Sequence, residues 1–286
     1  MKKLCDLHIH STYSDGTFTP KEIIEKSIDI GLSAVALCDH NTVDGIESFL
    51  SSAKNAKIEA VAGAEFSADL NGKEVHILAL FIPQDKLSEI SALMLDSNNR
   101  KEQSNIELVN KLCKAGFIID YDEIKRATPT GKVNRAHIGA ALTAKGYTAS
   151  VNEAFATLLS KNAGYYTPPH RFTAYEILDF INSIDAISVL AHPFLNLTAQ
   201  ELEEFLPLAK SHGLVGMECK YCLYDESTEK KAIAMADRFG LKYSGGSDFH
   251  GSIKPDISLG NGKGNLQIPY EWYINLKNHK KISSIL

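Results

Sequence analysis

Histidine and carboxylate side chains gather where the apolar segments of this sequence end. Asp15 lies in HSTYSDG, Glu65 ends the run AVAGAE, and Asp248 lies in GGSDFH. Five of the ten histidines stand at or just beyond the carboxyl end of an apolar run, namely His8, His10, His40, His192 and His250. Imidazole and carboxylate ligands together suit Zn, Mn or Fe. The pattern therefore favours a metal site.

The spacing within two of these segments strengthens this interpretation. Residues i and i+2 of a strand point to the same side, so His8 and His10 project together, as do Asp248 and His250 if their segment is extended. No cysteine pair accompanies these residues, which argues against a closed structural zinc site and for an open catalytic one. A single HxH pair is more often just a half-exposed strand, but five strand ends with the same chemistry favour several metal ions.

Short apolar runs alternate with amphipathic stretches along most of the chain. Capping boxes predict helix starts at Thr19, Thr173 and Thr198. Glycines typical of helix ends are Gly31, Gly213 and Gly240. This alternation predicts a parallel sheet covered by helices, open or closed into a barrel. Such folds build their sites from the carboxyl ends of the strands, so the scattered ligands should converge. The expected strands are 4–9, 33–38, 59–64, 75–82, 186–191, 214–219 and 241–245.

The stretch from 98 to 165 interrupts this alternation with helical patterns and no convincing strand. Ile106, Val109 and Cys113 repeat at helical spacing, and Asn134 and Asn152 are expected helix N-caps. We therefore expect residues 1–97 and 166–286 to form the metal-binding barrel, and 98–165 to form an inserted helical lid subdomain.

Composition limits the possible partners and location. The 286 residues are 44% apolar, with 30 basic and 35 acidic side chains and a net charge of -5, so no basic excess indicates a grip on long nucleic acid. The longest apolar run, Ile77 to Ile82, is far below the roughly 20 residues of a membrane-spanning helix. Polar residues interrupt the amino-terminal segment too early for a signal peptide. The five cysteines are an odd number, and we expect no disulfide framework. We expect a cytoplasmic protein without a membrane or obligate protein partner.

Six motifs, in this order, closely resemble those of the PHP family, named for polymerase and histidinol phosphatase: DLHIHSTYSDGTFTPKEII, ALCDHNTVDGI, GAEFS, VHILAL, LAHP and GGSDFH. The resemblance implies an α/β fold, a distorted (β/α)7 TIM-like barrel, carrying a metal-dependent phosphoesterase site. It also implies two or three divalent metal ions (Mn, Fe or Zn) at the carboxyl ends of the strands.

The same resemblance implies a ligand set. The first ion would be held by His8, His10, Glu65 and Asp248. The second would be held by Glu65, His76 and His192, so that Glu65 bridges the two, and the third by Asp15, His40 and His250. Asp15 stands where some family members carry histidine.

The insertion resembles a segment of a PHP subgroup that acts on nucleoside 3',5'-bisphosphates or short 5'-phosphorylated RNA. Members usually read GRPH or similar where this chain has Asn134-Arg135-Ala136-His137. Arg135 and His137, near the start of a helix capped by Asn134, would meet a phosphate with fixed charge, backbone N–H groups and the positive end of the helix dipole. We expect both to bind substrate and, with Glu65, to serve catalysis.

The resulting hypothesis is a phosphatase that removes the 3'-phosphate of a nucleoside 3',5'-bisphosphate, using a hydroxide held between two metal ions. The net charge of -5 favours such a small phosphorylated nucleotide over a polymer. Three alternatives remain: a 5'-to-3' exonuclease on short 5'-phosphorylated RNA, a histidinol-phosphate phosphatase, and a non-catalytic PHP scaffold. Hydrolysis of C–N bonds by a related barrel is disfavoured, since Glu65 stands where a bridging lysine is expected.

Overall fold

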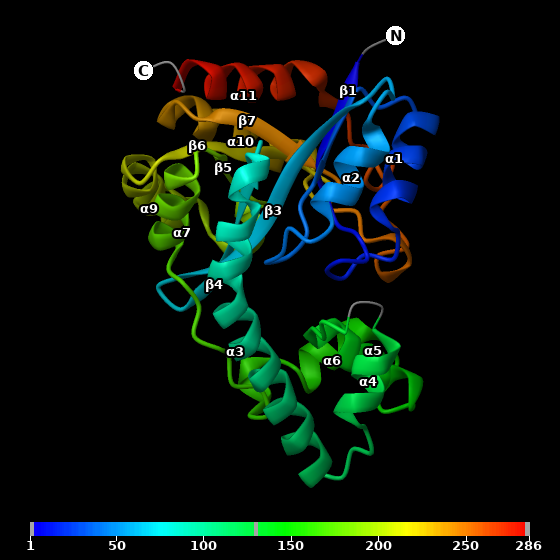
Figure 1. Ribbon diagram of the computed structural model, residues 1–286. Coiled ribbons are helices and arrows are strands. Elements are labelled where there is room, and N and C mark those ends of the chain that lie inside the picture. The colour runs from blue at the N-terminus through cyan, green and yellow to red at the C-terminus, as the bar shows by residue number, and fades with distance from the viewer. Residues whose placement is uncertain (1–2, 129–130, 284–286) are drawn as a thin grey trace. The chain divides into compact units, whose positions relative to one another are not determined.

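The computed structural model describes residues 3–128 and 131–283 and contains one eight-stranded sheet (Figure 1). Neighbouring strands follow the order β7-β6-β5-β4-β3-β2-β1-β8. The chain divides into two compact units, Met1–Ser91 with Phe172–Leu286, and Ala92–Arg171. The strands are β1 (Leu4–Ile9), β2 (Ala34–Leu37), β3 (Glu59–Leu70), β4 (Lys73–Leu80), β5 (Ile187–Leu190), β6 (Leu214–Tyr221), β7 (Lys242–Gly246) and β8 (Ile268–Pro269).

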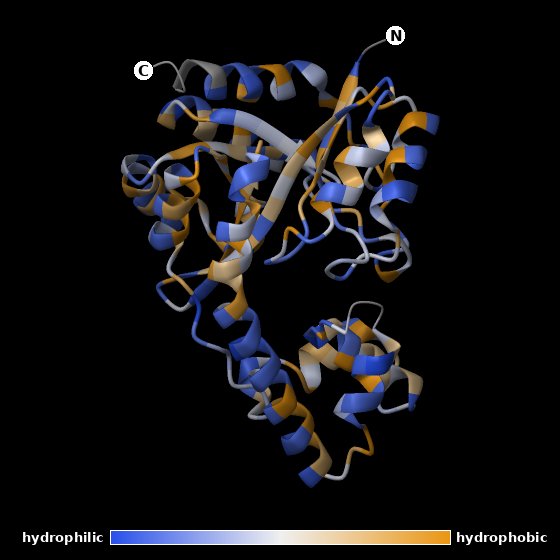
Figure 2. Ribbon diagram, viewed as in Figure 1, coloured by the Kyte–Doolittle hydropathy of each residue, from blue (hydrophilic) through white to orange (hydrophobic). Residues whose placement is uncertain are grey.

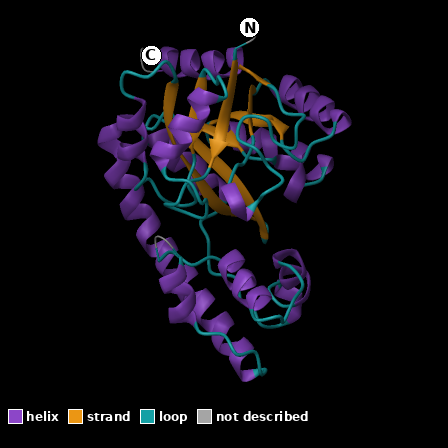
Figure 3. Ribbon diagram, turned by 90° about the vertical axis from the view of Figure 1, so that its right-hand side faces the viewer, coloured by secondary structure: helices purple, strands orange, loops and turns teal. Residues whose placement is uncertain are grey.

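Helices surround the strands of the first unit (Figure 3). The three predicted capping boxes are confirmed: Thr19, Thr173 and Thr198 each accept a hydrogen bond from the backbone of a glutamate three residues on, whose side chain bonds back. The three predicted glycines all have left-handed φ angles at helix ends. The helices are α1 (Pro20–Asp29), α2 (Ile46–Ala53), α7 (Ala174–Ser183), α8 (Pro193–Asn196), α9 (Ala199–Ser211), α10 (Glu226–Phe239) and α11 (Tyr270–Ser283), with 3-10 turns η1 (Gln84–Lys86) and η3 (Gly251–Ile253).

All seven predicted strands are present, but the predicted parallel arrangement is wrong for β4. It runs antiparallel to both β3 and β5. The cause is the two-residue connection Asn71-Gly72, with φ angles of 54° and 83°, which makes a tight hairpin and is too short for a crossover helix. Because β4 runs backwards, its first half lies beside the extended second half of β3, and His76 pairs with Ser67. The two-residue β8, antiparallel to β1, was not predicted.

Contacts between β1 and the end of β7 almost close the sheet into a barrel. The Asp248 N–H donates to the His8 carbonyl and the His10 N–H to the Phe249 carbonyl, each at 2.9 Å. The predicted α/β barrel is therefore confirmed, with eight strands. Helix α11 packs Tyr273 and Leu276 onto the barrel core. The described core residues of the strands include Leu7, Ala36, Leu78, Leu80 and Val189.

The second unit is helical, and no strand is found among its described residues. Leu108, Leu112, Ile138, Leu142 and Leu159 lie in its own apolar core. Its helices are α3 (Leu87–Lys114, beginning in the first unit), α4 (Tyr121–Ala127), α5 (Arg135–Ala144) and α6 (Val151–Thr157), with the turn η2 (Lys161–Ala163). The expected insertion, 98–165, begins and ends six residues inside this unit, and its action as a lid stays a prediction.

Two details of this unit concern helix starts and hydropathy. Asn134 caps α5 as predicted, but α6 is capped by Ser150 instead of Asn152, because the Ser150 hydroxyl accepts from the Glu153 N–H at 3.1 Å. The middle of the long helix α3 is hydrophilic, and hydrophobic residues lie toward its two ends (Figure 2). Within the described ranges, every helix is too short or too polar to cross a membrane.

Candidate metal centre

The two histidines of the HxH motif lie together on β1 and directly after it, with fully buried side chains. Their Nε2 atoms are 3.1 Å apart, and each is 3.3 Å from Oε2 of Glu65. Asp248 completes the group, since its Oδ1 is 3.2 Å from Nε2 of His10 and 3.8 Å from Nε2 of His8. The structure thus brings together all four residues expected to hold the first ion.

The Glu65 carboxylate faces two groups of histidines. Its Oε2, which faces His8 and His10, also lies 2.9 Å from Nδ1 of His40. Its Oε1 lies 2.8 Å from Nδ1 of His76 and 3.1 Å from Nε2 of His192. His76 reaches this position because β4 runs antiparallel to β3. The arrangement allows one carboxylate to serve two ions, as the resemblance implies.

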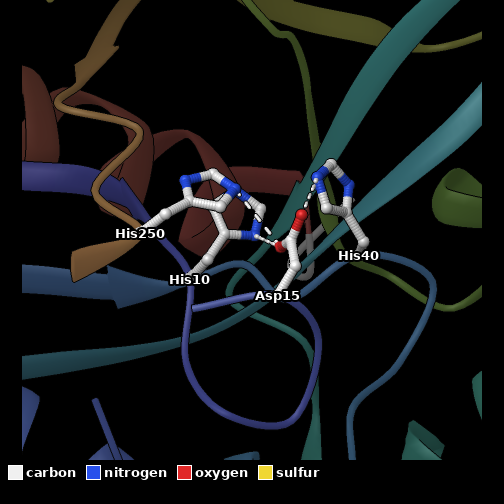
Figure 4. Close-up of side chains that lie close together, drawn as sticks. All are labelled: His10, Asp15, His40 and His250. Atoms are coloured by element: carbon white, nitrogen blue, oxygen red, sulfur yellow. Dashed lines mark ion pairs between the residues drawn. The ribbon is translucent and has the colours of Figure 1, made fainter. Parts of the chain in front are cut away.

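Asp15 is the centre of a third group (Figure 4). Its Oδ1 is 3.2 Å from Nε2 of His250 and 3.9 Å from Nδ1 of His10, and its Oδ2 is 3.8 Å from Nε2 of His40. His10 and His40 each lie within reach of two of the possible metal groups. The predicted division of the ligands among ions therefore stays a prediction, although their side chains converge.

The chemistry of this cluster fits divalent metal ions. The histidines and carboxylates form three sets, and within each set the possible ligand atoms all lie within 4.8 Å of one another. Buried polar atoms normally form hydrogen bonds, but within the described part of the chain four in this cluster form none, even where another ligand atom is near: His10 Nδ1, His40 Nδ1, Glu65 Oε2 and His192 Nδ1. Mixed imidazole and carboxylate donors suit Mn, Fe or Zn. The residues present can therefore hold such ions.

Buried hydrogen bonds fold the loop that carries Asp15. The carboxylate of Asp39, just after β2, accepts from the Ser11 N–H at 2.8 Å and from the hydroxyls of Ser11 and Ser14 at 2.6 Å. These bonds join the β1 loop to the next strand. Asp15 is thereby held beside the HxH pair.

Sequence reasoning missed three residues that support the expected ligands. Oδ2 of Asp248 accepts from the Tyr221 hydroxyl and the Lys254 ammonium, each at 2.7 Å, which leaves Oδ1 facing the histidines. Glu218 of β6 is fully buried and contacts His8 and His192. A glutamate inside the apolar run LVGMEC was the signal available for Glu218.

The expected substrate residues belong to the second unit. The Arg135 guanidinium lies 4.2 Å from the ring centre of Tyr166, and its Nη1 donates to the Leu159 carbonyl at 3.3 Å. Nδ1 of His137 accepts from the Asn134 N–H at 3.1 Å within the α5 capping box. Both residues therefore stand in the first turn of a helix, as predicted, and their role in binding substrate stays a prediction.

Charges in the metal-free cluster favour protonated imidazoles. Burial by itself lowers the pKa of His10, but Asp248 and Glu65 outweigh it and raise the pKa to about 9. Against the same effect of burial, Glu65 raises the pKa of His76 to about 10. For His40 burial prevails and lowers the pKa to about 4. At neutral pH the metal-free site therefore carries protons on some of its expected ligands.

Metal binding should therefore release protons. An imidazole must be neutral to bind an ion, and His10 and His76, with raised pKa values, are protonated at pH 7 without metal. We expect Mn²⁺ affinity to rise with pH between 6 and 8, on the order of tenfold per pH unit for each proton displaced. Calorimetric titration at pH 7 in buffers of different ionisation enthalpy measures the release, and a heat independent of the buffer would contradict it.

A family model for the PHP domain matches residues 6–166. The chain belongs to the PHP family. Among its relatives, a 5'-3' exoribonuclease of Haemophilus influenzae is 31% identical, over 87% of this chain and 91% of the relative. A phosphoribosyl 1,2-cyclic phosphate 1,2-diphosphodiesterase of Eggerthella lenta is 28% identical over 87% and 94%. A 3',5'-nucleoside bisphosphate phosphatase of Chromobacterium violaceum is 27% identical over 86% of each.

A solved structure similar to this chain supports the same conclusion. A Bifidobacterium adolescentis protein assigned as a metal-dependent phosphoesterase matches with a TM-score of 0.83 and 25% identity, over 96% of this chain and 95% of its own. The chain is therefore an enzyme, a metal-dependent phosphoesterase of the PHP family. Its buried cluster of histidines and carboxylates is able to bind the metal.

Proposed function

We propose that this PHP enzyme removes the 3'-phosphate of nucleoside 3',5'-bisphosphates. The observation that carries hydrolysis of a phosphate ester is the Glu65 carboxylate, whose two oxygens face separate groups of histidines. The bisphosphate phosphatase of Chromobacterium violaceum, similar over 86% of the chain, supports the substrate class. The net charge of -5 favours a small anionic substrate that meets the metal centre over a polymer held by a basic surface.

The second candidate is a 5'-to-3' exoribonuclease on short 5'-phosphorylated RNA. The Haemophilus influenzae relative named as a 5'-3' exoribonuclease is 31% identical to the chain, and this sequence similarity favours the second candidate. Both reactions need an ionised water at a phosphate ester, so the metal centre serves either. They differ in the bond that is broken and in the length of the substrate.

The proposed centre holds two or three Mn, Fe or Zn ions on nine residues. When bound, such ions lower the pKa of a water and neutralise charge on the phosphoryl oxygens. Glu65 would contribute a ligand oxygen to each of the first two ions, and the Tyr221 hydroxyl and Lys254 ammonium hold Asp248 in its orientation. The proposed ligands are His8, His10, Glu65 and Asp248 for the first ion, Glu65, His76 and His192 for the second, and Asp15, His40 and His250 for the third.

Arg135 and His137 are proposed to bind a substrate phosphate from the first turn of α5. The guanidinium lies over the Tyr166 ring, 4.2 Å from its centre, and a planar guanidinium can pair with phosphate oxygens through two hydrogen bonds. A charge-assisted hydrogen bond contributes about 1.5–3 kcal/mol, so we expect Arg135→Gln to lower kcat/KM about 10- to 100-fold. Steady-state kinetics and metal analysis test this. The exposed Arg126, in the same unit, gives the control Arg126→Gln, and loss of metal in Arg135→Gln would contradict a role at the substrate.

The deciding experiment measures product release by metal-free protein reloaded with Mn²⁺. Adenosine 3',5'-bisphosphate, histidinol phosphate and a short 5'-phosphorylated RNA are compared at equal concentration. Fast phosphate release from the bisphosphate supports the proposal, whereas mononucleotide release from the RNA at a higher kcat/KM supports the exoribonuclease. Preference for histidinol phosphate, or no reaction with the bisphosphate, overturns the proposal. We further propose a cytoplasmic location without a long nucleic acid, membrane or obligate protein partner.

A further inference from the structure

Glu218 is a buried carboxylate that contacts two expected metal ligands from behind. It lies on β6, and its side chain has no exposed surface. Its Oε1 is 3.1 Å from Nδ1 of His8, and its Oε2 accepts from the backbone N–H of His192 at 2.6 Å. The two oxygens therefore join β6 to β1 and to the segment just after β5.

The rings of the same two histidines face Glu65. Nε2 of His8 is 3.3 Å from Oε2 of Glu65, and Nε2 of His192 is 3.1 Å from Oε1. The two rings are stacked, with centres 5.7 Å apart and planes 18° from parallel. His8 and His192 thus lie between two carboxylates, Glu65 in front and Glu218 behind. A carboxylate on Nδ1 fixes the tautomer of His8 that presents Nε2 to an ion.

The contact to His192 concerns its backbone. His192 has φ 29° and ψ 53°, a conformation that residues other than glycine seldom adopt, and Pro193 follows it. The hydrogen bond from its N–H to Glu218 holds this peptide in place. Since the ring is attached to this backbone, the bond helps to place Nε2 of His192 near Glu65.

We propose that Glu218 is a positioning residue that orients His8 and His192 together, so that the first and second metal positions lose affinity together when Glu218 is altered. The inference rests on the proposed metal centre. The third group, Asp15, His40 and His250, has no contact with Glu218 among the hydrogen bonds and ion pairs of the described residues, and serves as an internal reference.

Glu218→Gln tests the proposal with a side chain of equal size. An amide offers one acceptor oxygen, so it places an NH₂ donor against either the His8 N–H or the His192 N–H. We expect two of the Mn²⁺ ions to bind about 10- to 100-fold more weakly, with binding at the third group unchanged. Chelator competition with metal analysis measures the affinities, and the absorption bands of Co²⁺-loaded protein should change as well.

Ser188→Ala is the matched control. Ser188 is equally buried, and its hydroxyl links β5 to β6, accepting from the Val215 N–H and donating to the Gly213 carbonyl near the start of β6. The substitution Ser188→Ala therefore removes hydrogen bonds between β5 and β6, at the end of these strands away from the metal centre. Metal affinity equal to wild type is expected in this variant. If it loses as much affinity as Glu218→Gln, loss of stability explains both and the proposal is overturned.

A second variant covers the case in which Glu218→Gln does not fold. Glu218→Asp keeps the charge but is shorter by one methylene, so it cannot reach both partners, and we expect at least one of the two ions to bind more weakly. Wild-type affinity for both ions in either folded variant would overturn the proposal. Because metal affinity is measured without substrate, a wild-type protein that binds metal but does not hydrolyse the bisphosphate would contradict the proposed function and leave this test intact.

Discussion

Glu65→Gln is expected to lower kcat/KM for phosphate release by about 10³-fold, because metal ions contribute several kcal/mol to the transition state. The change keeps the size of the side chain but removes its charge. Five histidines have a ring nitrogen 2.8–3.3 Å from one of the two Glu65 oxygens, and His76 is the nearest at 2.8 Å. A neutral amide has only one acceptor oxygen, so it cannot be a ligand both for an ion at one group of histidines and for an ion at the other.

Kinetics with Mn²⁺-loaded protein, metal analysis and circular dichroism together measure this effect. Glu74→Gln is the matched control, since Glu74 also contacts His76, at 3.4 Å, but from the half-exposed side. We expect it to retain most of the activity. A folded Glu65→Gln protein with its full complement of metal and more than a tenth of wild-type kcat/KM would show that Glu65 is not the bridging ligand.

Most of the barrel could be predicted from the sequence because buried parallel strands are continuous apolar runs and helices begin with capping boxes. The direction of β4 was missed because an apolar run has no direction of its own. The information lay in Asn71-Gly72, a pair typical of a two-residue hairpin. The strand β8 has two residues, too few for a pattern, and its pairing with β1 depends on residues more than 250 positions away.

In the candidate site too, the features set by local sequence patterns could be predicted, and those that depend on distant residues could not. The convergence of the nine expected ligands could be predicted because they lie in six short motifs, and the barrel brings these segments together. The supporting contacts of Glu218, Tyr221 and Lys254 could not be predicted, because they join segments distant in the sequence and depend on which side chains meet in three dimensions. The proposed role of Arg135 and His137 is tested by kinetics, since the contacts described for them lie within the helical unit.

Gly246→Ala is the stability change with the largest expected effect, a loss of about 3 kcal/mol in the free energy of unfolding. Gly246 ends β7 where the barrel closes, and a Cβ there would lie 2.1 Å from Cβ and 2.7 Å from the backbone N of His8. Backbone atoms cannot rotate away as a flexible side chain can. The strands must therefore separate, which weakens the nearby bond from the Asp248 N–H to the His8 carbonyl.

Thermal and urea unfolding of metal-free protein measure this loss without any contribution from bound ions. Gly45→Ala is the control: its added Cβ would lie 3.0–3.2 Å from side-chain atoms of Tyr13 and Leu37, which can move, so we expect a loss below about 1 kcal/mol. An equally small loss in Gly246→Ala would mean that β1 and β7 can separate freely. The approach of Asp248 to His8 and His10 would then need another cause, because closure of the barrel is what places that carboxylate beside them.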